Sequence, residues 1–516
     1  MKRNGHAHLL RTAFYSFLVA VGLLAQVPPT RFSGAVRGAP AYGSFWMALS
    51  TGRVVHVLGA RARFLAGGRP ATIQFLQPGM QVVVWGRMSF NQIIATEVDL
   101  PAPAQPSGGS PYRAPVSGPM PAATHVILSV KLDPQETDEW CWAASTKMVM
   151  DYISPCVLTT QCAEANHAFG LSTACQCPTP AVAINGAWPD QPLNQYGFTF
   201  KKSASALSWS DVTSEIGTSG RPFIFTWGWN SGGGHAMTAV GVTSLGPLDF
   251  VVANNPWLPY CQRCGSGAAP GGNVDYDTYG DFVGGTGYDH SHWIDYYDVQ
   301  GKYCRLLPHP AIKVELAEKP PLPPLPTLAS AVDIIMAGLS AQPGQVDLQS
   351  LGLSSPNGRG DFQPRPPIRV VEVNLRALAD YQPRQDPNRL LVDYHSRIVP
   401  VAAADTVRFG ITVTQIFGGF RVDSFGAANF VQAVTESIER RAIADRISPQ
   451  QFFLIEIPAL SVVLVARHQG TQLLVTSVYG QPQWKLEEGA ETLAAMTFSN
   501  LRQAAAQVLT KPHACE

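Results

Sequence analysis

The 516-residue sequence has little charge: Asp, Glu, Lys and Arg make up 14% of it, and the formal net charge is zero. This balance gives no support for binding nucleic acid through a basic surface. The chain also lacks a Walker-type or dinucleotide-binding glycine pattern between a strand and a helix. We therefore expect no nucleic-acid partner, no cofactor and no metal.

Long hydrophobic runs are missing as well. The apolar run at 12–25 is too short to cross a bilayer comfortably, since a spanning helix needs about 20 residues. Lys2, Arg3 and Arg11 precede it, which is the order of a secretory signal peptide over residues 1–25. We expect a secreted or periplasmic protein with no stable membrane insertion once the signal is removed. An uncleaved N-terminal anchor is the alternative.

The nine cysteines fit export, because disulfides form in oxidising compartments. Setting Cys141 aside for the reason given below, seven remain in the central region, enough for three disulfides with one cysteine over. A zinc site is the competing interpretation, because CxC and CxxC pairs can supply four thiolates. Because an exported protein folds in an oxidising compartment, we favour disulfides over the zinc site. The seven are Cys156, Cys162, Cys175, Cys177, Cys261, Cys264 and Cys304.

Proline and glycine are abundant, and they divide the chain. Residues 39–100 carry short alternating runs that predict a small all-β module, a β-barrel or sandwich similar to OB-like modules. Residues 101–123 form a Pro/Ala/Gly-rich linker, and 307–369 a Pro-rich linker with a short helix. Between them lies an α+β domain at 124–306, and an α+β domain of unknown function follows at 370–515. The fold class is α+β, multidomain.

One stretch carries the chemistry: QETDEWCWAAS, from Gln135 to Ser145. A predicted helix places Cys141 in its first turn, beside unpaired N–H groups and the positive end of the helix dipole. That position is expected to lower the thiol pKa and favour the nucleophilic thiolate. The same N–H groups could hold an oxyanion, with the Gln135 amide as a further donor. A buried structural cysteine is the competing interpretation.

Two downstream segments favour the catalytic interpretation. PFIFTWGWNSGGGHAMTAVGV reads as strand, glycine-rich turn and a second strand that opens with His235. LDFVVANNPW reads as a strand that ends in Asn254 and Asn255, just before Trp257. In order, Gln, Cys-Trp, Gly-Gly-His and Asn-x-Trp resemble the papain-like cysteine proteases over residues 124–306.

The resemblance implies a papain-like α+β fold and a role for each matched residue. Cys141 would be the nucleophile, His235 the base and Asn255 its orienter, with Asn254 as fallback, while Gln135 would help to bind the oxyanion. Trp257 would shield the Asn255–His235 hydrogen bond. The histidine follows the cysteine sooner than in papain, so the domain is similar to a compact bacterial branch that includes plant-pathogen effector proteases and bacteriocin-leader peptidases.

These residues predict a secreted cysteine endopeptidase, a thiol protease that acts on a protein or peptide substrate through a Cys-His-Asn acyl-enzyme mechanism. A transglutaminase or glutamine deamidase with the same Cys-His pair is one alternative, and an inactive papain-like binding module is another. The flanking domains are candidates for contact with the catalytic domain. His290 and His292, in an Asp-His-Ser-His sequence, are expected to be solvated loop residues rather than metal ligands.

Overall fold

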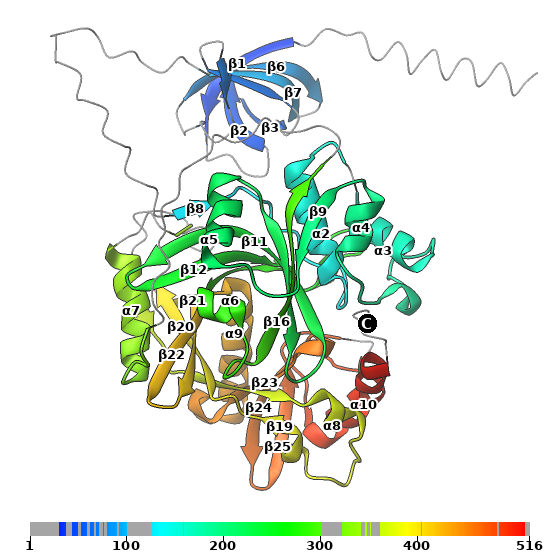
Figure 1. Ribbon diagram of the computed structural model, residues 1–516, viewed down its shortest axis with the longest axis vertical. Coiled ribbons are helices and arrows are strands. Elements are labelled where there is room, and N and C mark those ends of the chain that lie inside the picture. The colour runs from blue at the N-terminus through cyan, green and yellow to red at the C-terminus, as the bar shows by residue number, and fades with distance from the viewer. Residues whose placement is uncertain are drawn as a thin grey trace, which may run out of the picture. The chain divides into compact units, whose positions relative to one another are not determined.

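A computed structural model describes residues 30–100 with short internal gaps, 125–301 except 158, 322–341, 346–347, 351, and 362–510 except 404, 482 and 483. The predicted signal peptide and the 101–123 linker lie outside the described residues. The chain forms two compact units, residues 1–117 and 118–516, and each is described by itself (Figure 1). Among the described residues, no helix is both long and apolar enough to cross a membrane.

The first unit is a seven-stranded sheet. Alternate side chains of its strands point inward, and valines such as Val57 and Val84 are completely buried. The third strand pairs antiparallel with the second and parallel with the seventh. These pairings fit an all-β module, while the OB-like barrel stays a prediction. The strands are β1 (Thr30–Val36), β2 (Ser44–Leu49), β3 (Val54–Leu58), β4 (Arg63–Ala66), β5 (Arg69–Ala71), β6 (Gln81–Ser89) and β7 (Gln92–Leu100).

The second unit mixes helices and strands, as the predicted α+β class requires. The first half of its strands are β8 (His125–Ile127), β9 (Thr199–Ser203), β10 (Phe223–Trp229), β11 (Gly234–Leu245), β12 (Leu248–Asn255), β13 (Tyr260–Cys261), β14 (Ser266–Gly267), β15 (Asn273–Thr278) and β16 (His290–Gln300). Helices of the same half are α2 (Cys141–Ile153), α3 (Gln161–Phe169), α4 (Asp190–Gln195), α5 (Trp209–Thr213) and α6 (Tyr279–Val283).

The C-terminal half continues the same architecture. Its strands are β17 (Gln363–Pro364), β18 (Ile368–Val373), β19 (Leu391–Val392), β20 (Ser396–Ala403), β21 (Thr406–Ile416), β22 (Gly419–Gly426), β23 (Phe453–Ile457), β24 (Val462–Gln469), β25 (Gln472–Ser477) and β26 (Glu491–Leu493). Its helices are α7 (Leu328–Ala341), α8 (Leu375–Ala379), α9 (Ala428–Asp445) and α10 (Ala494–Thr510).

Strand pairing connects the two halves without a break. It runs from β16 through β10, β11, β12 and β15 to β22, and then through β21, β20 and β18 to β23 and β24. At the join, Tyr276 of β15 stacks on Phe425 of β22 with ring centroids 4.5 Å apart. Both residues belong to one buried cluster that also takes in α7. The protease-like and C-terminal segments thus share a core, and the domain boundaries drawn from the sequence stay predictions.

The β10–β11 hairpin shows how local sequence positions the site. Its strands are buried on both faces and rich in aromatic and β-branched residues, which suit a covered sheet. The turn needs glycine: Gly232 and Gly233 have φ of +111° and +82°. A Cβ on Gly233 would lie 2.6 Å from the Cβ of Ala459, so the C-terminal segment packs directly on this turn.

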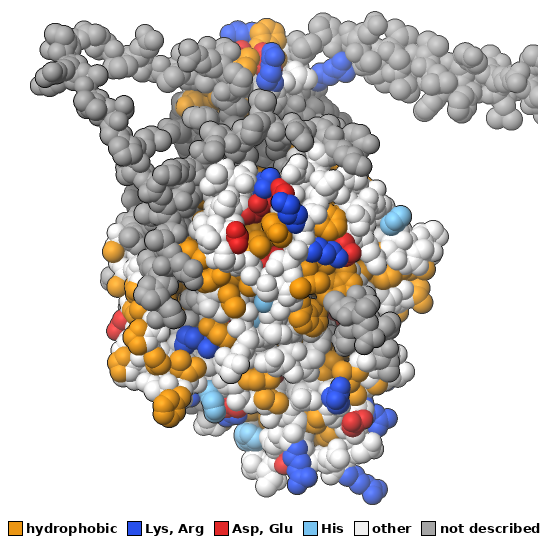
Figure 2. Space-filling model, viewed as in Figure 1, with side chains coloured by type: hydrophobic (Ala, Val, Ile, Leu, Met, Phe, Trp, Pro, Cys, Tyr) orange, Lys and Arg blue, Asp and Glu red, His pale blue; other side chains and the backbone are white. Residues whose placement is uncertain are grey.

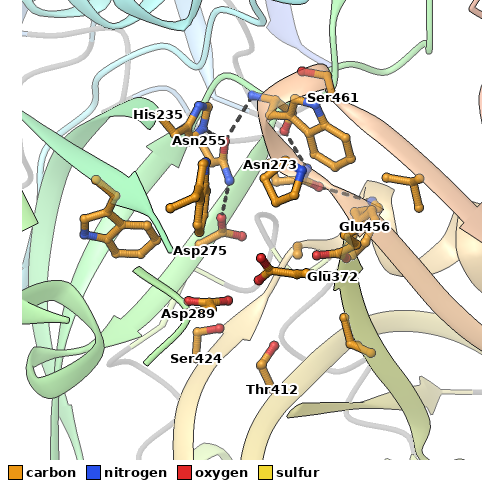
Figure 3. A pocket seen from close by; sticks show the side chains of 18 of the residues that line it. His235, Asn255, Asn273, Asp275, Asp289, Glu372, Thr412, Ser424, Glu456 and Ser461 are labelled. Carbon is orange, nitrogen blue, oxygen red and sulfur yellow. Dashed lines mark hydrogen bonds between the residues drawn. The ribbon is translucent and has the colours of Figure 1, made fainter. Parts of the chain in front are cut away.

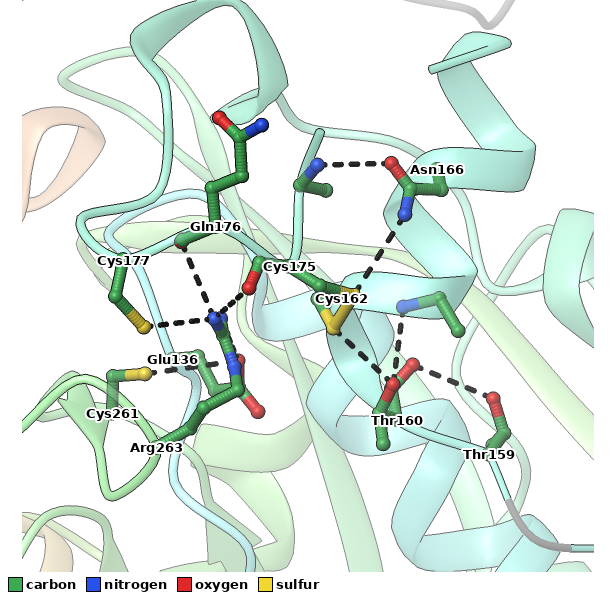
Figure 4. The surroundings of a disulfide bond; sticks show 12 residues. Glu136, Thr159, Thr160, Cys162, Asn166, Cys175, Gln176, Cys177, Cys261 and Arg263 are labelled. Carbon is green, nitrogen blue, oxygen red and sulfur yellow. Dashed lines mark hydrogen bonds and ion pairs between the residues drawn. A yellow bond between two sulfur atoms is a disulfide. The ribbon is translucent and has the colours of Figure 1, made fainter. Parts of the chain in front are cut away.

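Disulfide bonds hold the loops around α3, as expected for an exported protein. Cys162 pairs with Cys175, and Cys177 with Cys264, at Cα–Cα distances of 5.0 and 5.3 Å. Cys156 is disulfide-bonded too. Of the described cysteines, Cys141 and Cys261 are free thiols. The CxxC pair is therefore split between a disulfide and a free thiol. Figure 4 shows Cys177 and Cys261 beside Arg263, which donates to Sγ of Cys177.

The surface reflects the low charge of the sequence. Figure 2 shows a face on which hydrophobic and uncharged side chains predominate, with basic and acidic groups in small mixed clusters.

Candidate active site

The N-terminus of α2 positions the predicted nucleophile. Trp140 and Trp142 flank Cys141 and are almost completely buried. Their indole N–H groups donate to the carbonyl oxygens of Ala183 and Asn185, at 3.1 and 3.2 Å. Anchored on both sides, Cys141 is half-buried and lines a cavity.

His235 opens β11 and lines the same cavity. Its Nε2 lies 2.8 Å from Oδ1 of Asn255. The Trp229 ring stacks beside it at 22° to the imidazole, with centroids 6.4 Å apart. Cys141 hydrogen-bonds with the backbone of Ala236, the residue after His235. The structure thus brings Cys141, His235 and Asn255 to one cavity.

The Asn255 amide is fixed at both ends. Its Oδ1 also accepts from the backbone N–H of Trp257 at 3.0 Å, and its Nδ2 donates to Oδ2 of Asp275 at 2.8 Å. Because Nδ2 is taken by Asp275, the oxygen faces His235. The fallback Asn254 instead donates to the carbonyl of Val130, so it does not serve the histidine.

Gln135 is buried in the loop before α2, and it is not among the residues that line the cavity. Its Nε2 donates to the carbonyl oxygens of Thr137 and Asp138, at 2.9 and 2.7 Å. Its backbone N–H donates to Pro256, which ties the nucleophile's loop to the one that follows Asn255. The structure therefore shows Gln135 shaping the loop, and it does not bring the amide to the cavity.

Burial sets the protonation of Cys141 and His235, the predicted nucleophile and base. Desolvation raises the pKa of the Cys141 thiol to about 12, against a smaller lowering by the backbone of Ala236. The same burial lowers the pKa of His235 to about 4, although the Asn255 hydrogen bond opposes it. The expectation of a lowered thiol pKa was wrong, because desolvation outweighs the helix N-terminus. At neutral pH the pair is a neutral thiol and a neutral imidazole.

The cavity that holds these residues has a volume of about 240 Å³, and both halves of the second unit line it. Figure 3 shows His235 and Asn255 at one side and side chains of the C-terminal strands at the other. Trp257 lines the cavity and packs on Phe430 and Tyr479, with centroids 5.4 and 6.1 Å away. Its shielding of the Asn255–His235 bond stays a prediction.

Sequence reasoning missed several residues here. Three carboxylates line the cavity: Asp275, in NVDYDT, and Glu372 and Glu456, each the one carboxylate of a mostly apolar strand, in IRVVEV and FLIEI. A lone carboxylate inside a mostly buried strand is the signal that could have found the two glutamates. His290 and His292 are also not solvated: they lie in β16, hydrogen-bonded to neighbouring aspartates.

A cysteine at a helix N-terminus, with a histidine oriented by an amide across a shared cavity, is the arrangement of a cysteine peptidase. Residues 127–262 match the family described as "Peptidase_C39 like family", and this span includes Gln135, Cys141, His235 and Asn255. The match supports a papain-like cysteine protease family for this part of the chain. No curated protein matches the chain.

Proposed function

We propose that the protein is an exported cysteine endopeptidase whose catalytic residues are Cys141, His235 and Asn255. The observation that carries this proposal is the 2.8 Å contact between His235 Nε2 and Asn255 Oδ1, in the cavity that Cys141 also lines. Export rests on the N-terminal sequence and is supported by the disulfides around α3. The match of residues 127–262 supports peptidase chemistry and a protein or peptide substrate.

The hydrogen bonds fix the histidine tautomer. Because Asn255 Oδ1 is an acceptor, Nε2 of His235 carries the proton, and Nδ1 is left to accept a proton from the Cys141 thiol. As Sγ attacks the scissile carbonyl, the thiol proton moves to Nδ1. His235 then returns this proton to the leaving amine as the C–N bond breaks, and water hydrolyses the thioester by the same steps.

The pair starts neutral, so the charge separation takes place during the reaction. Burial holds the thiol pKa high and the imidazole pKa low, which opposes formation of an ion pair in the free protein. Asn255 stabilises the imidazolium that forms, since its oxygen accepts from Nε2–H.

The developing oxyanion is assigned to the backbone N–H of Cys141 at the start of α2. Gln135 becomes a donor only if it releases a carbonyl of Thr137 or Asp138 when substrate binds. An oxyanion donor is worth about 3 kcal/mol in well-studied hydrolases. Gln135→Ala would therefore lower kcat more than a hundredfold if the amide moves, and much less if it only supports the loop.

The test compares wild type with Cys141→Ala on a peptide library, with cleavage products identified by mass spectrometry. Cys261→Ala is the matched control, because Cys261 is the other described free thiol. We expect cleavage by wild type and the control, and labelling of Cys141 by an E-64-type epoxide. Undiminished cleavage by folded Cys141→Ala would overturn the proposal. Label incorporation from a labelled amine into casein, without peptide release, would point to transglutamination instead.

A further inference from the structure

The cavity that holds Cys141 has an acidic far side. Asp289, just before β16, Glu372 of β18 and Glu456 of β23 all line it, and we call these three the acidic chamber. Glu372 and Glu456 stand opposite each other in the parallel pairing of β18 with β23. In Figure 3, Glu372 lies between Asp275 and Glu456, and Asp289 lies below Asp275, which links to Asn255 and His235.

Glu372 is the member that most needs explanation. Its side chain is 97% buried, as its exposure is 3%, and its Oε2 has no hydrogen-bond partner among the described residues. The carboxyl group points into the cavity in Figure 3, and its side-chain hydrogen-bond neighbours are Ser231 and Asp289. A buried carboxylate oxygen without a partner is costly, so folded proteins rarely retain one without a role.

The chamber also lacks a compensating cation. The described residues that line the cavity include no lysine or arginine, while Asp138 and Glu139 add two more acids near Cys141. Asp289 has a partner in His290, at 2.7 Å, but this histidine does not line the cavity. Two ionised acids side by side on adjacent strands would destabilise the sheet, and no basic side chain in the described wall offsets them. Burial therefore keeps protons on Glu372 and Glu456 until a cation arrives.

We propose that the acidic chamber binds the ammonium or guanidinium group of a lysine or arginine side chain in the peptide substrate, which makes it a specificity site next to Cys141. This inference rests on the proposed function. A basic side chain supplies the missing charge and donates to the free oxygen of Glu372. Apolar residues of the same cavity, among them Val370 and Ile398, suit the methylene stem.

Size and ligand geometry favour an organic cation. One water needs about 10–15 Å³ of such space, so a cavity of about 240 Å³ has room for an extended side chain. The described residues contain no group of three or more His, Cys, Asp or Glu side chains spaced to hold a metal ion. The chamber thus offers charge spread over separate carboxylates, which suits the several donors of a guanidinium.

We expect the binding of a basic side chain to release protons from Glu372 and Glu456. Burial raises the pKa of Glu372, with Asp289 adding to the shift, and raises the pKa of Glu456 to about 8. Both carboxyls therefore carry protons at pH 7, and an arriving cation displaces them, so affinity rises between pH 6 and 9. The titratable groups that face the chamber are Asp275, Asp289, Glu372, Tyr394 and Glu456, and His290 contacts Asp289.

The first experiment needs no catalysis. Butylguanidine, a cation, and butylurea, its uncharged analogue, are titrated calorimetrically into the full-length Cys141→Ala protein at pH 7 and 8.5. We expect butylguanidine to bind at least about tenfold more tightly than butylurea, as hydrogen bonds to charged groups allow, with proton release. Glu372→Gln and Glu456→Gln should each remove most of this preference, while Glu436→Gln, on the exposed face of α9, should retain it.

The second experiment uses wild-type protein and peptides that differ only in arginine or citrulline at each position. We expect kcat/KM to favour arginine by about tenfold or more at one position, and this ratio to approach one in Glu372→Gln. Equal cleavage of both peptides, with no butylguanidine preference, would overturn the chamber and leave the peptidase standing. Failure of wild type to cleave any peptide would refute the proposed function, and the titration would still decide what the chamber binds.

Discussion

Asp275 provides the sharpest test of the proposed active site. Replacing it by Asn should lower kcat with little change in KM, because Asp275 touches neither the nucleophile nor the histidine. Its Oδ2 accepts from Nδ2 of Asn255 at 2.8 Å, and this contact decides which end of the amide faces His235. Without the carboxylate, the amide can rotate and present an N–H group to Nε2, which stabilises the wrong tautomer.

The size of the expected fall in kcat follows from the hydrogen bonds that hold the Asn255 amide. A hydrogen bond to a charged group contributes about 1.5–3 kcal/mol, and each 1.4 kcal/mol corresponds to about tenfold in rate. The Trp257 backbone N–H still holds Asn255 Oδ1 at 3.0 Å in the variant, so part of the orientation survives. We therefore expect kcat to fall about tenfold, the lower end of the range.

The pH profile separates this role from a structural one. Burial raises the pKa of Asp275 to about 6, against the lowering by its hydrogen bond to Asn255. Above pH 6 the carboxylate accepts from Asn255, and as the pH falls through 6 it is protonated and becomes a poorer acceptor. Wild-type kcat should therefore decline on the acid side near pH 6. In Asp275→Asn this decline should move toward the lower pKa of His235, about 4.

The assay is the pH dependence of kcat and KM for one cleaved peptide, with thermal unfolding to check the fold. Asp333→Asn is the matched control, because Asp333 is exposed on α7. A kcat within twofold of wild type, or an acid-side decline that persists near pH 6 in Asp275→Asn, would refute the orientation argument.

Two further predictions concern the cysteines. Alkylation of Cys141 by iodoacetamide should accelerate about tenfold per pH unit between pH 6 and 9, because its thiol pKa is raised to about 12; a rate that levels off near neutral pH would contradict this. Peptide mapping without reduction should find the pairs Cys162–Cys175 and Cys177–Cys264 and an unlinked Cys261; a Cys177–Cys261 link would refute the pairing.

The sequence predicts the local parts of the site well. Cys141 begins a helix because a run of helix-forming residues follows it, and His235 begins a strand because a glycine turn precedes it. The choice of Asn255 over Asn254 came from a two-residue spacing to Trp257, and the geometry agrees with it. These features depend on neighbours in the chain, which a sequence displays directly.

The sequence could not predict those properties of the site that depend on segments distant in the chain. The thiol pKa follows from how completely Cys141 is desolvated, which strands far along the chain decide. The Gln135 amide binds two carbonyl oxygens of its own loop, and only the path of that loop shows this. Spacing identifies which residues meet, but it does not give their burial or the hydrogen bonds they exchange.

The acidic chamber could not be predicted from local sequence patterns either, although one feature of the sequence indicates it. Its members come from three segments, and the parallel pairing that sets Glu372 beside Glu456 joins strands with four others, β19, β20, β21 and β22, between them in the chain. No local pattern predicts such a pairing. Yet each glutamate is the one carboxylate of a mostly apolar strand, where a charge is costly to bury. Because a fold tolerates that cost only where something offsets it, two such strands in one sequence indicate that their charges face a shared site.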